Sequence, residues 1–496
     1  MNSGARANMP HLLSTAAPPL SGQSAEPAAS ERYLGLFALT AVVMLIGQAL
    51  QISDGFLNDT ALLLLTLALA AATCAFVAPR IGWVERQGPR LLPAVAGFAL
   101  IFELWSLLQK APAAYLEVKD LRWAWLFVGG ILLAALIGGF GPSRIAPRHW
   151  LSAMVVIHFI LGVWIVRMTP APYIDMFCLH RESCNAFLHG HNPYTVTWPD
   201  IYGNRVGNIP GTVVNGRVVG GFPYPPISLL CALPGYLAGD FRYSQLAAMS
   251  IAALLLAFAR GTRLSAVVAA LVLFTPRTFY MIEEGWTEPF IIVFLAATLY
   301  CAARGHTRLV PVFLGLFLAS KQHMVLAIPA AALLVGTPFH WRRYARMLGI
   351  ALATAACVTL PFFLWNPPAF FQAVVIRHLH KDFRLDCLSW SAWMVAHGGA
   401  VVTNAVALPA SLLVMALALW KLPCTSAAFA AALGVQFLVF FLFNNSACNY
   451  YYMVLAMFGA AVAFATPASL RPAPPWRRST ASIPATTAAS PPAGQF

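Results

Sequence analysis

The sequence has little charge, and the charge it has is unbalanced. Only 10% of its 496 residues are Asp, Glu, Lys or Arg, and 17 acidic side chains stand against 31 basic ones. A soluble domain carries about 25% charged residues, so a soluble fold is excluded. The net charge of +14 does not predict a nucleic-acid partner, because the arginines form short clusters between hydrophobic runs. Such clusters orient membrane helices.

Two further signals are missing. The nine cysteines do not show the spacing of a metal site. Residues 1–33 are rich in Ala, Pro, Ser and Gly and lack the continuous hydrophobic core of a signal peptide. We therefore interpret residues 1–33 and residues 468–496 as disordered cytoplasmic tails.

Hydrophobic residues make up 59% of the chain, and the mean hydropathy is +0.71. A membrane-spanning helix needs roughly 20 apolar residues, and about fourteen such segments fit the sequence. The predicted fold is therefore an all-α polytopic membrane protein with about fourteen transmembrane helices and additional helices on the outer membrane surface. The predicted compartment is the inner (plasma) membrane.

Three membrane-associated parts follow from the hydrophobic pattern. Residues 34–169 form an N-terminal five-helix segment, residues 170–243 a polar loop, and residues 244–467 a C-terminal bundle. The five expected spans are 34–53, 60–79, 91–109, 123–141 and 150–168. With the N-terminus inside, the arginines between these spans are cytoplasmic and residues 170–243 lie outside.

The polar loop opens with Asp175, just beyond the fifth span. Met176, Leu179, Cys184, Phe187 and Leu188 are spaced to share one face of a surface helix, with His180, Arg181 and Glu182 largely off that face. Residues 204–221 are predicted as a hairpin or flap. Residues 224–237 are too short and too rich in proline for an easy crossing, so they are expected to lie flat on the outer surface.

This topology brings further polar clusters to the outer side. Glu283, Glu284 and Glu288 lie in one turn, and Lys321 and His323 in the next. The loop 365–390 carries a basic run that includes Arg377 and His378, and the sequence NNSACNYYY starts at Asn444. Cys178, Cys184, Cys387 and Cys448 also fall on this side, where a disulfide is compatible with the sequence, which does not pair them.

The order of these pieces resembles the GT-C superfamily of integral-membrane glycosyltransferases, in particular the mannosyltransferase-like bacterial branches that use polyprenyl-phosphate sugars. The likeness lies in Asp175 after a span, then FLHGHNPY, FPYPPISLL, GLFLASKQHMVLAIP and NNSACNYYY. It covers residues 172–457 and leaves the first four spans outside.

The resemblance implies an extracytoplasmic enzyme that moves a sugar from a polyprenyl-phosphate donor to a lipid or glycan acceptor, with inversion. Asp175 would be the general base, because an ionised carboxylate accepts the proton of an attacking hydroxyl. Departure of the phosphate requires positive charge nearby. The expected donor-phosphate residues are Lys321, His323, Arg377 and His378. The expected substrate-binding residues are Tyr194, Tyr224, Glu284, Asn449 and Tyr450.

The sequence also departs from the family pattern. Many relatives have two acids close together in the first loop, whereas Asp175 is followed by Met176 and Phe177. This difference argues against a divalent cation, and no other cofactor is predicted. Glu283, Glu284 or Glu288 are alternative sources of a second carboxylate.

Each cluster also has a purely structural interpretation. Lys321 would anchor a helix end at the interface, the run from Arg377 to Arg384 would bind anionic lipid headgroups, and Tyr450 would belong to an aromatic belt. At the level of function, a transporter or lipid flippase is the main alternative to a transferase. A non-catalytic scaffold for envelope-polymer assembly is a third.

Overall fold

The computed structural model describes residues 33–79, 81–116, 124–141, 145–203, 212–336, 338–380, 382–402 and 404–465, with the backbone alone for 124–128. The two predicted tails lie outside these residues, apart from Tyr33, which begins the first helix. The first part of the expected hairpin, residues 204–211, also lies outside them.

The N-terminal part contains five helices, as the sequence predicts. They are α1 (Tyr33–Ser53), α2 (Asp59–Val77), α3 (Gly82–Gln109), α4 (Ala124–Phe140) and α5 (Pro147–Met168). Only α3 differs clearly from expectation, because it begins nine residues before the expected start at residue 91. Its first two turns are amphipathic rather than apolar, so hydropathy alone places the start too late.

The rest of the chain is also mainly helical. The α-helices are α6 (Asp175–Leu188), α7 (Pro226–Leu237), α8 (Arg242–Phe258), α9 (Arg263–Leu273), α10 (Thr278–Glu283), α11 (Glu288–Ala303), α12 (Val310–Leu318), α13 (Trp341–Trp365), α14 (Pro367–Phe371), α15 (Arg377–Leu379), α16 (Trp390–Ala396), α17 (Asn404–Lys421), α18 (Ser426–Leu442) and α19 (Cys448–Phe464). The shorter turns are η2 (Pro193–Thr195), η3 (Gln322–Ala327), η4 (Pro329–Leu334) and η5 (Gln372–Ile376), and the strands are β1 (Thr197–Pro199), β2 (Val213–Val214) and β3 (Arg217–Val219).

The protein is an all-α membrane protein. Among the described residues, six helices are long and apolar enough to cross a membrane, namely α1, α2, α3, α5, α13 and α17. The pair α7 and α8 would add a seventh if it formed one span, but the two helices are bent by 110°. Five apolar helical segments of 10–17 residues pack among the long ones. Length and composition therefore account for six or seven of the roughly fourteen predicted spans.

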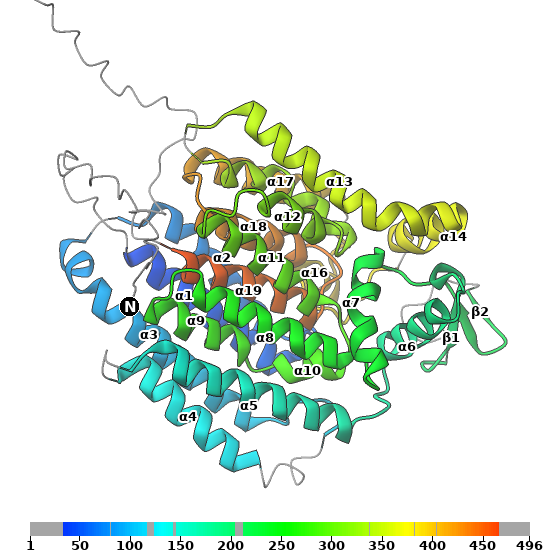
Figure 1. Ribbon diagram of the computed structural model, residues 1–496, viewed down its shortest axis with the longest axis horizontal. Coiled ribbons are helices and arrows are strands. Elements are labelled where there is room, and N and C mark those ends of the chain that lie inside the picture. Colours follow the sequence, from blue (N-terminus) through cyan, green and yellow to red (C-terminus); the bar gives the residue numbers. More distant parts are fainter. Residues whose placement is uncertain are drawn as a thin grey trace, which may run out of the picture.

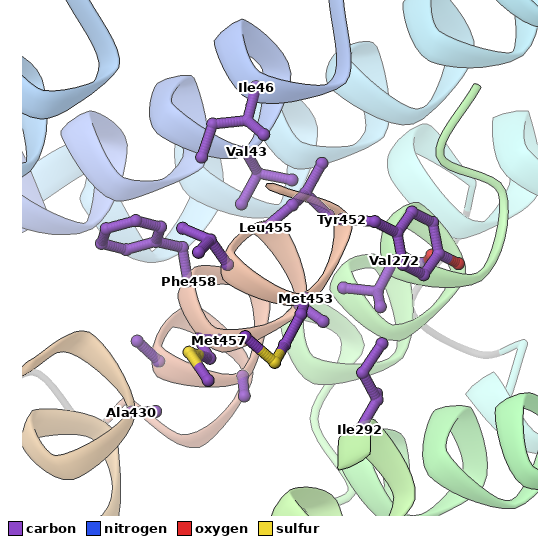
Figure 2. Packing of buried hydrophobic residues seen from close by; sticks show 14 of the residues in the cluster. Val43, Ile46, Val272, Ile292, Ala430, Tyr452, Met453, Leu455, Met457 and Phe458 are labelled. Atoms are coloured by element: carbon purple, nitrogen blue, oxygen red, sulfur yellow. The ribbon is translucent and has the colours of Figure 1, made fainter. Parts of the chain in front are cut away.

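The centre of the bundle is α19, which is buried along its whole length. Figure 2 shows Tyr452, Met453 and Leu455 of α19 between Val43 of α1 and Val272 of α9. The helix also packs against α18 and α11. A helix that is apolar all round has to be enclosed by other helices, so the C-terminal segment forms the core that the N-terminal helices cover.

Arginines cap helix ends at one end of the bundle. Arg260 donates to the carbonyl of Phe464, the last residue of α19, at 2.8 Å, and Arg304 donates to the carbonyl of Phe258 at the end of α8. Arg263 binds the last carbonyls of α4. The last carbonyls of a helix lack partners within the helix, so a guanidinium satisfies them and interacts favourably with the helix dipole. The clusters that the positive-inside rule places in the cytoplasm therefore also hold helices together.

The polar loops gather at the opposite end, which we call the rim. It contains α6, the three strands, the turn between α10 and α11, the segment after α12, and residues 382–389 beside the start of α19. In Figure 1, α6, α7, β1, β2 and α14 lie together at the right-hand side of the bundle. The four polar clusters predicted to share one side do so with Asp175.

Impermeant thiol labelling tests which end faces out. On a background without the accessible native cysteines, Val214→Cys at the rim should react in intact cells. Thr307→Cys at the arginine end should react only after permeabilisation, since both positions are exposed and differ only in side. Reaction of Thr307→Cys in intact cells would overturn the orientation.

Candidate functional site

Asp175 begins α6 at the rim. Its main-chain N–H donates to the Tyr202 hydroxyl at 3.3 Å. Its carboxylate is half-buried and has no hydrogen-bond or ion-pair partner among the described residues. The main chain of Asp175, and not its carboxylate, therefore ties the start of α6 to Tyr202. The carboxylate is left free to act on another group.

The face predicted for α6 is correct in part. Met176, Leu179 and Cys184 are buried, but Leu188 is exposed and His180 is fully buried rather than off the face. The imidazole of His180 stacks on Phe241 at 4.9 Å and hydrogen-bonds the carbonyl of Met176, one turn earlier. The helix packs against α7, β1 and η2, so more of its circumference is covered than in a helix with one face on a membrane surface.

The predicted hairpin is confirmed for its described residues. β2 and β3 pair across a turn in which Asn215 and Gly216 both have positive φ, and β1 pairs on the other side of β3. Asn-Gly is the preferred pair for such a two-residue turn. After β3, Gly220 lies directly against the tip of the Arg377 side chain, so the hairpin covers that residue.

Tyr194 and Tyr224 connect the loop to the rest of the rim. The hydroxyl of Tyr194 donates to the carbonyl of Tyr224 at 3.0 Å, and its ring packs on Phe370 of α14 at 4.6 Å. The FPYPP segment is thus buried under α14 and η5, and α7 begins at the second of its consecutive prolines. Both tyrosines are almost fully buried, at 2% and 8% exposure, so in this structure they support the site from beneath.

Lys321 lies after α12, where its ammonium is buried and forms an ion pair with Glu288. Asn449 donates to the same carboxylate oxygen at 2.8 Å. The ammonium lies 5.0 Å from the ring centre of Tyr224 and 4.6 Å from that of Tyr450. Four expected site residues, Lys321, Tyr224, Asn449 and Tyr450, therefore come together around Glu288, which balances the lysine charge.

The two expected histidines lie on either side of this group. The imidazole of His323 packs edge-on against Tyr450 at 5.6 Å. That of His378 hydrogen-bonds the carbonyl of Pro223 at 2.8 Å and lies 6.0 Å from the Tyr224 ring. His323 also packs edge-on against Phe437 and Phe441, so its imidazole is enclosed by aromatic rings.

Arg377 is partly buried and has no hydrogen-bond or ion-pair partner among the described residues. Its guanidinium lies 4.8 Å from the ring centre of Trp198 on β1, and its Nη1 atom is buried. Burial lowers the pKa of Arg377, and the negative charge of Asp175 opposes that change. A buried N–H without a hydrogen-bond acceptor is costly. An anion bound at Nη1 would remove that cost.

The other buried bases have acidic partners. Arg242 binds Asp240 at 2.7 Å, and Arg277 binds Asp54 at 2.6 Å. Arg242 also holds the carbonyls of Val166 and Thr169 at the end of α5. Sequence reasoning missed both arginines, and it named Glu288 only as an alternative second carboxylate and not as the partner of Lys321. The short spacing in DFR, residues 240–242, is a local signal for the first pair, but the Arg277 and Glu288 pairs join distant segments that no local pattern connects.

The two acids at the end of α10 have different environments. Burial raises the pKa of Glu283 to about 7, although main-chain N–H groups of Ala114 and Tyr115 bind its carboxylate. Burial, followed by the charges of Glu283 and Asp175, raises the pKa of Glu284 to about 9. Glu284 is therefore neutral at pH 7 and can donate a hydrogen bond. Neither Glu284 nor Asp175 has a hydrogen-bond or ion-pair partner for its carboxyl group among the described residues.

Two other site features concern sulfur and metals. All nine cysteines are free, including the four at the rim. Within the described residues, no three His, Cys, Asp or Glu side chains converge as metal ligands. The charge of Asp175 affects the pKa of Glu284. A cation bound by these two carboxyl groups would have to draw its remaining ligands from substrate or water.

Comparison with known proteins adds no assignment: no family model, no curated protein and no solved structure matches this chain.

The raised pKa of Glu284 predicts a pH dependence of stability. Because the folded protein binds this proton more tightly than the unfolded chain, stability falls as pH rises from about 4.3 towards the folded pKa of about 9. Glu284→Gln cannot ionise, so its melting temperature should exceed that of the native protein at pH 9 and match it at pH 5. If the melting temperatures of the two proteins differed by the same amount at pH 5 and pH 9, the ionised Glu284 carboxylate would be exposed to water.

Proposed function

We propose that this protein is a membrane glycosyltransferase that moves a sugar from a polyprenyl-phosphate donor to an extracytoplasmic acceptor. The observation that carries the proposal is a pair of uncompensated charges at one rim. Arg377 lacks an anion and Asp175 lacks a cation, although the charge of Asp175 acts on Arg377. Such a pair, held apart rather than neutralised, fits a reaction that needs a base and an anion site in one place.

In the proposed reaction, an acceptor hydroxyl attacks the anomeric carbon of the donor sugar. The bond from that carbon to the acceptor oxygen forms as the bond to the phosphate oxygen breaks. Asp175 takes the hydroxyl proton, and the departing phosphate keeps the electron pair of the broken bond. Arg377 then stabilises the charge that develops on the phosphate. Attack from the face opposite the phosphate gives inversion.

Lys321 has a different part in this proposal from the one the resemblance implies. Its charge is already balanced by Glu288, so a phosphate would have to displace a buried carboxylate to reach it. We assign the phosphate to Arg377, with His378 beside it. Lys321, Glu288 and Asn449 then fix Tyr224 and Tyr450, which form the floor on which the sugar would lie.

The proposed architecture keeps fourteen crossings, about the number that the hydrophobic runs allow. The α-helical segments of 10–17 residues and the η3 and η4 turns would complete the crossings that the longer helices begin. Short segments are tolerated at membrane depth when other helices enclose them. The active site then faces the outside of the inner membrane, on the side of the rim.

One observation favours a transporter instead. Lys321 and Glu288 form a buried ion pair next to η3 and η4, two short turns in place of a regular helix. Transporters place charged residues at broken helices near the membrane centre. The two functions differ in outcome. A transferase releases free polyprenyl phosphate from a purified donor, whereas a transporter moves the donor without cleaving it.

Replacement of Arg377 tests the proposed phosphate site. With radiolabelled polyprenyl-phosphate sugars and membrane extract as acceptor source, Arg377→Ala should lower sugar transfer about 10²- to 10³-fold, the cost of losing one charge-stabilising donor. Arg377→Lys should retain part of the rate, because a positive charge remains.

Arg384 supplies the matched control for Arg377. It lies in the same loop but is paired with Asp386 at 2.6 Å, so Arg384→Ala should leave transfer within about threefold of the native rate, since an exposed ion pair contributes little. Equal losses in the Arg377→Ala and Arg384→Ala proteins would remove the special role of the unpaired guanidinium.

Asp175→Asn tests the base. The change keeps size and removes the charge that accepts the proton, so kcat should fall about 10²- to 10⁴-fold with donor binding kept. Because the carboxylate holds no structural partner, the melting temperature should not change. Asp175→Glu should recover little, since a shift of about 1 Å in a reacting group can cost about 10²-fold. Full activity of Asp175→Asn would transfer the role to another acid.

A further inference from the structure

The described part of the loop after α3, residues 110–116, is attached to the rim at two points. At its start, the guanidinium of Arg277 binds the carbonyl of Ala111 at 2.6 Å. Further on, the main-chain N–H groups of Ala114 and Tyr115 bind the carboxylate of Glu283. The two anchors flank α10, so the first membrane helices place residues 111–115 directly against the turn that carries Glu284.

Two tyrosines next to this attachment are exposed but fixed. Tyr115 is 43% exposed and Tyr173 is 58% exposed. The hydroxyl of Tyr115 donates to the carbonyl of Tyr173 at 2.7 Å, and the hydroxyl of Tyr173 donates to that of Ile201. Tyr202 meets Tyr173 edge to face at 5.9 Å. We call Tyr115, Tyr173 and Tyr202 the tyrosine platform.

The tyrosine platform differs from an aromatic belt at a membrane interface. In a belt, the hydroxyl is directed to water while the ring lies in the lipid headgroups. Here the hydroxyls of Tyr115 and Tyr173 bind the protein's own carbonyls, and their rings stay exposed. Tyrosine offers a large amphipathic contact surface, and ordering its side chain on binding costs little conformational entropy. The hydrogen bonds that already hold Tyr115 and Tyr173 in place lower that cost further.

Acidic groups border the platform. Burial raises the pKa of Tyr115, and the charges of Glu284, Glu283 and Asp175 raise it further. Asp175 is also joined to the platform through the Tyr202 hydroxyl. The charge of Asp175 thus acts on the pKa of both Tyr115 in the platform and Arg377.

We propose that the tyrosine platform binds a carbohydrate acceptor, presenting its hydroxyl to Asp175. Fixed ring faces suit the apolar face of a sugar, and neighbouring carboxyl groups suit its hydroxyls. The platform would select a glycan over a lipid alcohol. The N-terminal helices would contribute to the site because Tyr115 lies in the segment that follows α3. The acceptor role rests on the proposed function, whereas glycan binding itself does not.

Direct binding tests the platform without any transfer reaction. The full-length protein, in nanodiscs, is applied to an array of synthetic oligosaccharides that present hexoses, pentoses and amino sugars. The native protein should bind at least one member. Tyr115→Ala and Tyr173→Ala should bind that member about tenfold more weakly, the scale of losing one aromatic anchor. Tyr115→Trp, which keeps an aromatic face, should retain binding.

The control is Tyr300→Ala, which removes a half-buried tyrosine beside His306 at the arginine end and should leave glycan binding unchanged. Melting temperatures taken in parallel separate lost binding from lost folding. Absence of glycan binding by the native protein, or unchanged binding by folded Tyr115→Ala and Tyr173→Ala, would overturn the platform. Glycan binding without any cleavage of polyprenyl-phosphate sugars would leave the platform in place and reject the transferase.

Discussion

A charged side chain removed from water needs an opposite charge or several hydrogen bonds, and this requirement organises the rim. Arg242 meets it with Asp240 and the carbonyls at the end of α5, and Arg277 meets it with Asp54. These pairs join α1, α5, α8 and α10, so that distant segments converge. Arg377 is only partly removed from water and has no acidic partner among the described residues, which separates it from the arginines that build the rim.

The division between buried pairs and unpaired charges also explains how one end of a hydrophobic bundle can hold polar chemistry. Lys321 with Glu288 and Asn449 forms a closed group beneath the tyrosine rings. Asp175 and Arg377 lie above an enclosed floor, and the hairpin covers the arginine at Gly220. A local base and an anion site then remain available beside the ion pairs of Arg242, Arg277 and Lys321.

Hydrophobic pattern predicted the all-α membrane class, because long apolar runs have few alternatives in a membrane, and six or seven of the fourteen expected spans are long and apolar enough to cross. The five N-terminal helices and the hairpin turn at Asn215 and Gly216 follow from local sequence. The pattern failed where burial comes from tertiary packing, as for His180, and where a helix continues past its apolar part, as in α3. The convergence of the rim was also predictable from topology, but the pairing of Lys321 with Glu288 was not. It joins residues 33 positions apart, and no local pattern reports which cation finds a partner and which does not.

The central claim is that the uncompensated guanidinium of Arg377 receives the donor phosphate. An experimental structure of the full-length protein with bound polyprenyl monophosphate tests it most directly. The account predicts phosphate oxygens within hydrogen-bonding distance of the Arg377 guanidinium, with the ion pair of Lys321 and Glu288 intact. Phosphate bound to Lys321 with Glu288 displaced, or bound away from the rim, would contradict it.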